Sequence, residues 1–223
     1  MRVVVTRERG HNAELISWLP EGTAVSEVPL TTTRYFDSNE VRDALVASPN
    51  NGQFRALVVT SARSALYVAL AREALAPGAR VLTVGTATAR ALEEEDVVVD
   101  LTGEGGAGDL AEEISVGPVL VLGAASMREE LRDALVVRGI EVEHLACYET
   151  VSAELTPSGE SNLREADVAF IGAPSAWRVA AAFIEPACWV VVPGPSTGDV
   201  VAHEHARVIE GWSPEIANRL VAL

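Results

Sequence analysis

Short runs of branched apolar residues alternate along the chain with segments whose apolar positions follow a helical period. Val3-Val4-Val5 opens this pattern and predicts a buried strand, and residues 12–19 carry apolar side chains at helical spacing. Pro20, Gly22 and the cluster at 49–52 are turn residues that separate such segments. Further strands are predicted at 24–30, 56–60, 80–84, 97–101, 119–122, 142–147, 168–171, 189–192 and 207–210.

Helices are predicted between many of these strands. They cover 41–46, 64–75, 87–92, 109–114 with Asp109 as N-cap, and 127–138. The alternation of strand and helix predicts an α/β protein with parallel sheets and helical crossovers. Aromatic residues make up only 5% of the chain, so Val, Leu, Ala and Ile must fill the cores. This composition suits sheets that helices cover on both faces.

Three blocks of the first half recur in the same order in the second half. Residues 3–7 with the strand at 25–30 resemble 119–123 with the strand at 142–147. Residues 57–65 resemble 168–176, and 84–89 resemble 193–198. Any strand-turn-helix protein shows weak self-similarity, but three matches in one order favour a true duplication.

The predicted strands divide into two parallel-sheet lobes. A sheet between two helix layers needs about five strands. The middle of the chain supplies one such set, and the first two and last three strands supply the other. We therefore expect an inserted middle lobe at 34–148 and a discontinuous outer lobe at 1–33 and 149–223. The extended segments near 31–35 and 147–152 are expected to pair as a two-strand hinge.

Charge and composition narrow the classes of partner. The 32 acidic and 17 basic residues give a net charge of −15, which argues against nucleic acid and against an anionic membrane surface. The sequence has no apolar run of membrane-spanning length and no secretory signal, so we expect a cytoplasmic protein. Cys147 and Cys188 are expected to be reduced and buried. Neither they nor the four histidines have metal-site spacing.

Polar turns after the predicted strands form the candidate binding site, because parallel sheets bind ligands beyond the carboxyl ends of their strands. Helix N-termini and arginine side chains bind carboxylates or phosphates there. Capping and tight turns explain any one of these turns equally well, but their number points to a small polyanion. The turns are 6–7 with Thr6 and Arg7, 60–63 with Arg63, 85–88, 103–108, 123–128 with Arg128, 172–175 and 193–197.

Tyr148 is the side chain best suited to proton transfer. It lies at the second crossing between the lobes, where its phenol can donate a proton to a leaving oxygen. From the residues alone, an amphipathic tyrosine with its hydroxyl in water is the better explanation. No phosphate-binding P-loop motif occurs, and the glycine-rich stretch at 103–108 is a weak match to a dinucleotide fingerprint.

A series of short motifs resembles the uroporphyrinogen-III synthase family over essentially the whole chain. The motifs are Val5-Thr6-Arg7, Val28-Pro29-Leu30, Val59-Thr60-Ser61-Ala62-Arg63, Val84-Gly85-Thr86-Ala87-Thr88-Ala89, Gly123 with Arg128 and Leu131, Cys147-Tyr148-Glu149-Thr150, and Gly194-Pro195-Ser196-Thr197. The resemblance implies two flavodoxin-like lobes joined by a two-strand ladder, with the site in the cleft between them. It also implies a cofactor-free lyase of haem biosynthesis. Such an enzyme cyclises hydroxymethylbilane to uroporphyrinogen III, with loss of water and inversion of the last ring.

The resemblance also assigns residues in this chain. Tyr148 would assist the leaving hydroxyl group. Ser61, Arg63, Thr88 and Thr197 match positions that the family uses around its ligand, and backbone N–H groups near Thr86, Ser175 and Ser196 would hold carboxylates. Gly172 stands where the family usually has serine, so one side-chain contact is lost.

The resemblance leads us to expect a monomer that binds the linear tetrapyrrole and needs no metal or cofactor. Two other functions remain open. A non-catalytic ligand-binding or regulatory module is compatible with the same two-lobed plan. A flavodoxin-like electron carrier is a further alternative, but the turns lack the aromatic residues that flank a flavin.

Overall fold

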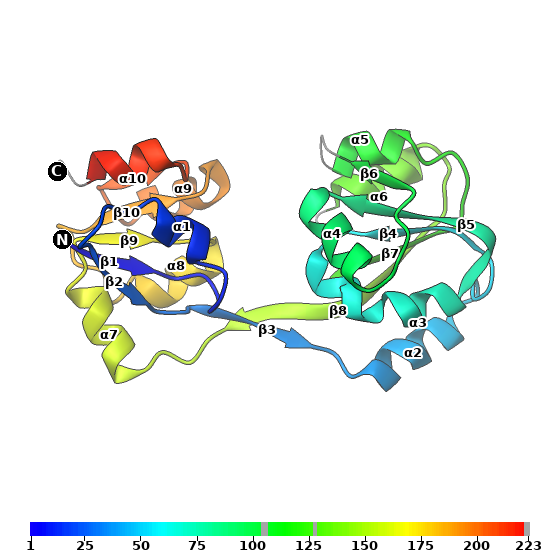
Figure 1. Ribbon diagram of the computed structural model, residues 1–223, viewed down its shortest axis with the longest axis horizontal. Helices are drawn as coiled ribbons and strands as arrows, with labels where there is room; N and C mark the ends of the chain where they lie inside the picture. The colour runs from blue at the N-terminus through cyan, green and yellow to red at the C-terminus, as the bar shows by residue number, and fades with distance from the viewer. Residues whose placement is uncertain (104–106, 127–128, 221–223) are drawn as a thin grey trace. The chain divides into compact units, whose positions relative to one another are not determined.

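The structure is a computed structural model, and it describes residues 1–103, 107–126 and 129–220. The chain forms two compact units (Figure 1). The discontinuous unit consists of Met1–Thr33 and Thr150–Leu223, and the inserted unit consists of Arg34–Glu149. The domain boundary expected at 33/34 coincides with the first division, and the one expected at 148/149 lies one residue before the second.

The discontinuous unit contains a parallel sheet of five strands in the order β11-β10-β9-β1-β2. Residues of β1 alternate between two cores, because Val4 packs on one face of the sheet and Val3 and Val5 on the other. Both faces of the strand are buried, which explains its unbroken valine run. The strands are β1 (Arg2–Val5), β2 (Ala24–Glu27), β9 (Val168–Phe170), β10 (Trp189–Val192) and β11 (Val208–Glu210).

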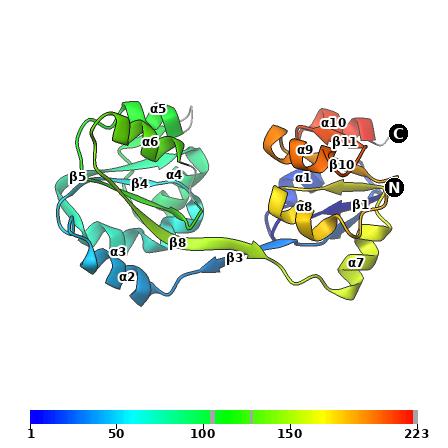
Figure 2. The same cartoon turned by 180° about the vertical axis from the view of Figure 1, so that it is seen from behind.

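Helices cover both faces of this sheet, and Figures 1 and 2 show the unit from its two sides. The helices α7 (Pro157–Arg164), α8 (Pro174–Ala180) and α9 (Pro195–Ala202) contribute to the core that contains Val4. The helices α1 (Ala13–Ser17) and α10 (Pro214–Leu220) pack in the core of Val3 and Val5.

The inserted unit contains a sheet of six strands in the order β3-β8-β7-β4-β5-β6. Leu57 and Val59 face one core, and Ala56 and Val58 face the other. The strands are β3 (Thr31–Tyr35), β4 (Phe54–Val59), β5 (Leu75–Val84), β6 (Leu101–Gly103), β7 (Val119–Ala124) and β8 (Val142–Ser152). One face is covered by α2 (Ser38–Ala47), the 3₁₀ helix η1 (Ala62–Tyr67), α3 (Val68–Glu73) and α4 (Thr86–Glu94), and the other by α5 (Ala107–Glu112) and α6 (Glu130–Val137).

The strand order of the two sheets supports the internal duplication. In the discontinuous unit a pair of strands, β2-β1, is followed across the sheet by β9-β10-β11. In the inserted unit the pair β8-β7 is followed in the same way by β4-β5-β6. The pair comes first in the chain in one unit and last in the other. Each sheet is therefore built from the same two blocks in opposite sequence order.

The strands β3 and β8 carry the chain across the boundaries of the units and are neighbours in the six-stranded sheet. The Phe36 N–H donates to Cys147 O at 3.0 Å, and the Ala153 N–H donates to Leu30 O at 3.0 Å. The partners run in opposite sequence directions, so the two strands are antiparallel. Figures 1 and 2 both show them side by side. The predicted two-strand connection is confirmed.

The strand predicted at 97–101 was wrong in position, because β6 covers only Leu101–Gly103. The Val97 N–H donates to Leu92 O and so closes the end of α4, and the Val97 side chain is buried in a core. Asp100 accepts the Val81 N–H through its carboxylate at 2.7 Å. Val97 therefore packs at the end of α4, whereas Val98 is 79% exposed. A β-branched pattern alone does not distinguish such a segment from a strand.

Two predictions about helices also needed correction, and one helix was missed. The helix expected at 64–75 is divided into η1 and α3, and Leu75 already pairs with Phe54 as the first residue of β5. Asp109 lies inside the first turn of α5 and is not its N-cap. The polar helix α7 was not predicted, although Thr156 caps it by accepting the Gly159 N–H. Among the described residues, no helix is long and apolar enough to cross a membrane.

Candidate active site

The strands β4, β5 and β7 of the inserted unit end at one edge of their sheet, and β1, β9 and β10 do the same in the discontinuous unit. The turns after these strands therefore gather at one edge of each sheet, which we call its carboxyl edge. The described parts of the predicted polar turns lie at these edges.

Tyr148 of β8 is packed among side chains from two other elements of the inserted unit. Its ring centroid lies 6.3 Å from that of Tyr35 in β3, with an interplanar angle of 52°. The Arg63 Cζ lies 6.0 Å from the centre of the Tyr148 ring. Tyr148 is only 6% exposed and belongs to an apolar core cluster. Packing therefore holds the phenol in one orientation, which differs from the freely projecting side chain that the sequence suggested.

Ser61 fixes the turn from which Arg63 reaches this tyrosine. Its backbone is extended, and its Oγ accepts the Arg63 N–H at 3.3 Å, so it caps η1. Both side chains are half-buried. A short polar residue is favoured at such a cap because it satisfies a backbone donor of the first turn. The structure therefore brings together Ser61, Arg63 and Tyr148 from the predicted set.

The start of α4 lies beside this cluster, because α4 contacts η1. Gly85 precedes the helix at φ +80°, a left-handed conformation that favours glycine, and no side chain caps the helix. The first N–H groups of an uncapped helix lack partners and lie at the positive end of its dipole. Thr86 is exposed there, whereas the Thr88 side chain is buried at 5% exposure.

At the carboxyl edge of the discontinuous unit, Thr6 and Arg7 have different environments. The Thr6 hydroxyl is buried and donates to Phe170 O at 2.7 Å, so it links β1 to β9. Arg7 is exposed, and its Cζ lies 5.3 Å from the centre of the Trp212 ring. Arg7 can therefore reach a ligand, whereas the Thr6 side chain is already occupied within the unit.

The helices α8 and α9 begin at the same edge and contact each other. Each has proline at its start and no side-chain cap. Ser196 is exposed and Ser175 is half-buried, while Thr197 is buried at 2% exposure. A ligand at this edge would therefore meet backbone N–H groups and the two serines, with Thr197 beneath them.

Two of the predicted elements fall partly or wholly outside the described residues. Arg128 is one of them. The other is the glycine-rich turn at 103–108, of which 104–106 lie outside the description. Gly172 is described, and a Cβ added there would lie 3.4 Å from Trp212 Cη2 and 3.6 Å from Arg7 Cγ. Both are ordinary van der Waals contacts, so the position has room for the Cβ of the serine that the resemblance leads us to expect.

Buried ionisable groups near the site are poorly suited to reaction. Burial raises the pKa of the Cys147 thiol, next to Tyr148, to about 12. Burial likewise raises the pKa of Tyr67, whose hydroxyl donates to Phe36 O. A thiol with so high a pKa is a weak nucleophile at neutral pH. Among the described residues, no three His, Cys, Asp or Glu side chains cluster as metal ligands would.

Two aromatic side chains at these edges were not predicted from the sequence. Tyr35 is 48% exposed beside Tyr148, and Trp212 lies against Arg7 and near Gly172. Both residues follow or end a predicted extended segment in a chain with few aromatics. That combination is the sequence signal that would have singled them out.

Comparisons with known proteins agree on one family. The family model described as Uroporphyrinogen-III synthase HemD matches residues 20–212. A crystal structure of uroporphyrinogen-III synthetase from Helicobacter pylori is similar at 18% identity and a TM-score of 0.64, covering 100% of this chain and 99% of that chain. A mutant uroporphyrinogen III synthase from Thermus thermophilus is similar at 18% identity and a TM-score of 0.62, with the same coverage. No curated protein matches the chain significantly.

At such low identity the two crystal structures support the fold: two parallel-sheet α/β lobes. The family model covers most of the chain and includes Tyr148, Ser61 and Arg63. The chain therefore belongs to the uroporphyrinogen-III synthase family, whose members are cofactor-free cyclising lyases.

Proposed function

We propose that this chain binds hydroxymethylbilane through turns at both carboxyl edges and that Tyr148 assists the departure of its hydroxyl group. The observation that carries the proposal is the packing of Tyr148, whose ring is held by Tyr35 and Arg63 at the edge where the polar turns gather. A fixed phenol can present its proton repeatedly in one geometry, which general acid catalysis requires.

The chemistry needs one proton to be donated and later recovered. The Tyr148 phenol protonates the leaving hydroxyl as its carbon–oxygen bond breaks, so that water departs and an azafulvenium cation remains. Attack by the last pyrrole ring through a spiro intermediate then closes the macrocycle with that ring inverted. Loss of a proton from the cyclised product returns a proton to the phenolate. The overall change is loss of one water, with no oxidation or reduction.

The substrate carboxylates are bound by positive groups on an acidic protein. Arg63 and the uncapped start of α4 supply them in the inserted unit, and Arg7 and the start of α9 in the discontinuous unit. Arginine pairs with carboxylate through two parallel hydrogen bonds, and a helix N-terminus offers unpaired N–H groups. The proposed contacts are Arg7, Ser61, Arg63, Thr86, Ser175 and Ser196. The side chains of Thr6, Thr88 and Thr197 are buried within the units. Arg128 lies outside the described residues.

Holding the carboxylates decides which product forms. Free hydroxymethylbilane closes directly to the type I isomer, so the protein must hold the chain where the inverted closure is faster. Such positioning removes orientational entropy from the barrier and favours one transition state over another.

Incubating the protein with freshly generated hydroxymethylbilane and resolving the isomers tests this function. We expect type III to dominate and to form faster than spontaneous closure. Type I alone at the spontaneous rate would contradict the proposal and would favour the non-catalytic binding module.

We propose further that the protein acts as a monomer in the cytoplasm. All the groups assigned above come from one chain, and Cys147 and Cys188 are buried in separate cores, so the fold does not depend on a disulfide or on an oxidising compartment. Sedimentation at working concentration and cell fractionation test the two statements. A stable dimer or a secreted protein would contradict them.

A further inference from the structure

Trp212 lies just after β11, over the carboxyl edge of the discontinuous unit. Its Nε1–H donates to Val191 O at 3.3 Å. Its ring meets that of Phe170 edge to face, with centroids 6.3 Å apart. These contacts anchor the half-buried indole to the ends of β9 and β10 and fix where its face lies.

The Arg7 guanidinium packs over the face of the Trp212 ring, with its Cζ 5.3 Å from the ring centre. Within the described ranges, Arg7 forms no ion pair. A guanidinium that lies over an aromatic ring keeps its N–H groups in its own plane, directed away from the ring. The contact with the Trp212 ring restricts the Arg7 side chain and leaves its N–H donors unused by the ring. Arg7 is therefore ordered in advance for a bidentate contact with a carboxylate.

We propose that Trp212 is a positioning residue that holds Arg7 for a carboxylate of the substrate. The pair borders the turn of Gly172, since both partners lie within 3.6 Å of a Cβ added at that glycine. The inference rests on the proposed function, because the ligand is the tetrapyrrole's carboxylate.

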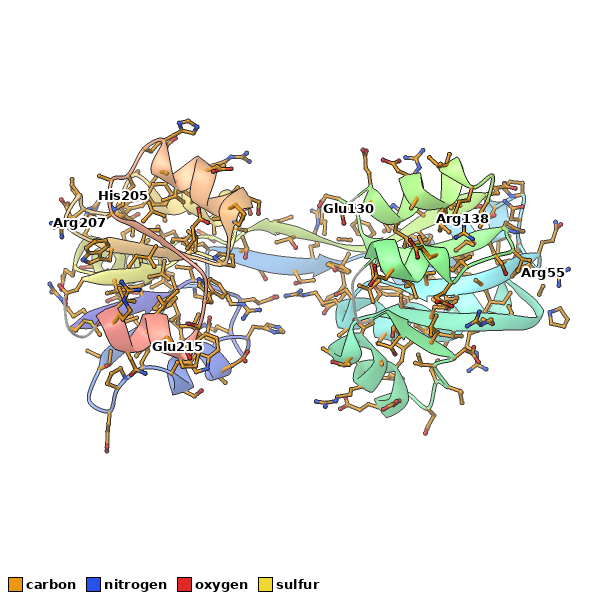
Figure 3. The ribbon with its side chains drawn as sticks, turned by 90° about the horizontal axis from the view of Figure 1, so that it is seen from above. Arg55, Glu130, Arg138, His205, Arg207 and Glu215 are labelled. Atoms are coloured by element: carbon orange, nitrogen blue, oxygen red, sulfur yellow. The ribbon has the colours of Figure 1, made fainter. Side chains whose placement is uncertain are left out.

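The same unit contains a matched control at the other edge of the sheet. The Arg207 Cζ lies 5.4 Å from the centre of the Trp189 ring, nearly the distance in the Arg7–Trp212 pair. Trp189 is the first residue of β10 and Arg207 precedes β11, so this pair lies at the amino ends of the strands. Arg207 is labelled in Figure 3. Both pairs are arginine–tryptophan contacts, but one lies at the carboxyl edge of the sheet and the other at the amino ends of the strands.

Steady-state kinetics with hydroxymethylbilane separate the two pairs. We expect Trp212→Leu to raise KM by roughly 2- to 30-fold, the range of a lost cation–π contact, with kcat unchanged. Trp212→Phe keeps a ring face and should raise KM by less than about 3-fold. Trp189→Leu should leave both constants as in the wild type.

A double-mutant cycle shows whether Trp212 acts through Arg7. In an Arg7→Gln background, Trp212→Leu should have no further effect on KM, because the side chain that it positions is gone. An equal rise in KM with and without Arg7 would overturn the proposal, and so would a rise that Trp189→Leu reproduces. If Trp212→Leu does not fold, Trp212→His keeps a smaller ring and carries the same comparison, with an expected rise of about 2- to 5-fold.

The outcomes also separate this inference from the function on which it rests. A wild type that yields only type I product would refute the proposed function itself. An active wild type whose KM is insensitive to Trp212 would refute the role of Trp212 alone.

Discussion

Replacing Tyr148 with phenylalanine removes one oxygen atom and leaves the packed ring in place. The ring is 6% exposed, 6.3 Å from Tyr35 and 6.0 Å from the Arg63 guanidinium, and phenylalanine can keep all these contacts. We therefore expect the free energy of unfolding to change by less than about 1 kcal/mol. A positioned general acid contributes about 100- to 10,000-fold, so kcat should fall by that factor, equivalent to roughly 3 to 5.5 kcal/mol.

The assay follows both isomers over time from freshly generated hydroxymethylbilane. As the enzymatic rate falls, spontaneous closure competes, so the type I fraction should rise while the remaining enzymatic product stays type III. Tyr35→Phe is the matched control, because it removes the same atom from the neighbouring, more exposed ring. It should change kcat by less than about 3-fold, since this phenol is assigned no proton transfer. A Tyr148→Phe protein with the wild-type kcat would refute the reasoning, as would an equal loss in Tyr35→Phe.

Three further predictions concern stability and reactivity. Gly123→Ala should destabilise the protein by about 1 to 3 kcal/mol in urea denaturation, because the added Cβ would lie 2.6 Å from Thr60 Oγ1; an unchanged midpoint would contradict this packing. Burial raises the pKa of Cys147 and Cys188 to about 12, so neither should react with a thiol reagent at pH 8 until the protein unfolds. Burial lowers the pKa of His144 below 6.5, so its contribution to stability is full above pH 6.5 and is lost as pH falls through the lower folded value. The stability difference between wild type and His144→Gln should therefore shrink from pH 7 to pH 5, and a constant difference would contradict the assignment.

The strands of the sheet centres were predictable because burial on both faces leaves an unbroken apolar signature. Val3–Val5 and Val119–Leu122 show it directly, and both lie inside sheets. The run at 97–101 is similarly rich in valine, yet the Val97 N–H closes a helix by donating to Leu92 O and Val98 is 79% exposed. A run of apolar residues therefore shows neither which of its side chains are buried nor which backbone group each N–H bonds. Helix α7 was missed for the converse reason, since its sequence is mostly polar.

The candidate site was predicted as a set of turns, and its side-chain geometry was not. Strand ends and helix starts are local features, so the turns of Ser61 and Thr86 could be located from the sequence. The contacts Arg63–Tyr148 and Arg7–Trp212 join residues far apart in the chain. Which aromatic ring supports which arginine depends on strand order, and the sequence pattern does not contain it. The buried hydroxyl of Thr6 illustrates the same limit, because only the register of β1 with β9 brings it to Phe170 O.

The central claim is that turns of both units bind the same substrate molecule, and the KM of two arginine variants tests it most directly. Arg63→Gln in the inserted unit and Arg7→Gln in the discontinuous unit should each raise KM for hydroxymethylbilane by about 10- to 100-fold, the cost of a lost charge-assisted hydrogen bond. Arg55→Gln is the control, since this exposed arginine lies at the amino end of β4 and is labelled in Figure 3. The KM of the Arg55→Gln variant should match that of the wild type. A KM that responds to one of the two site arginines and not to the other would contradict the claim.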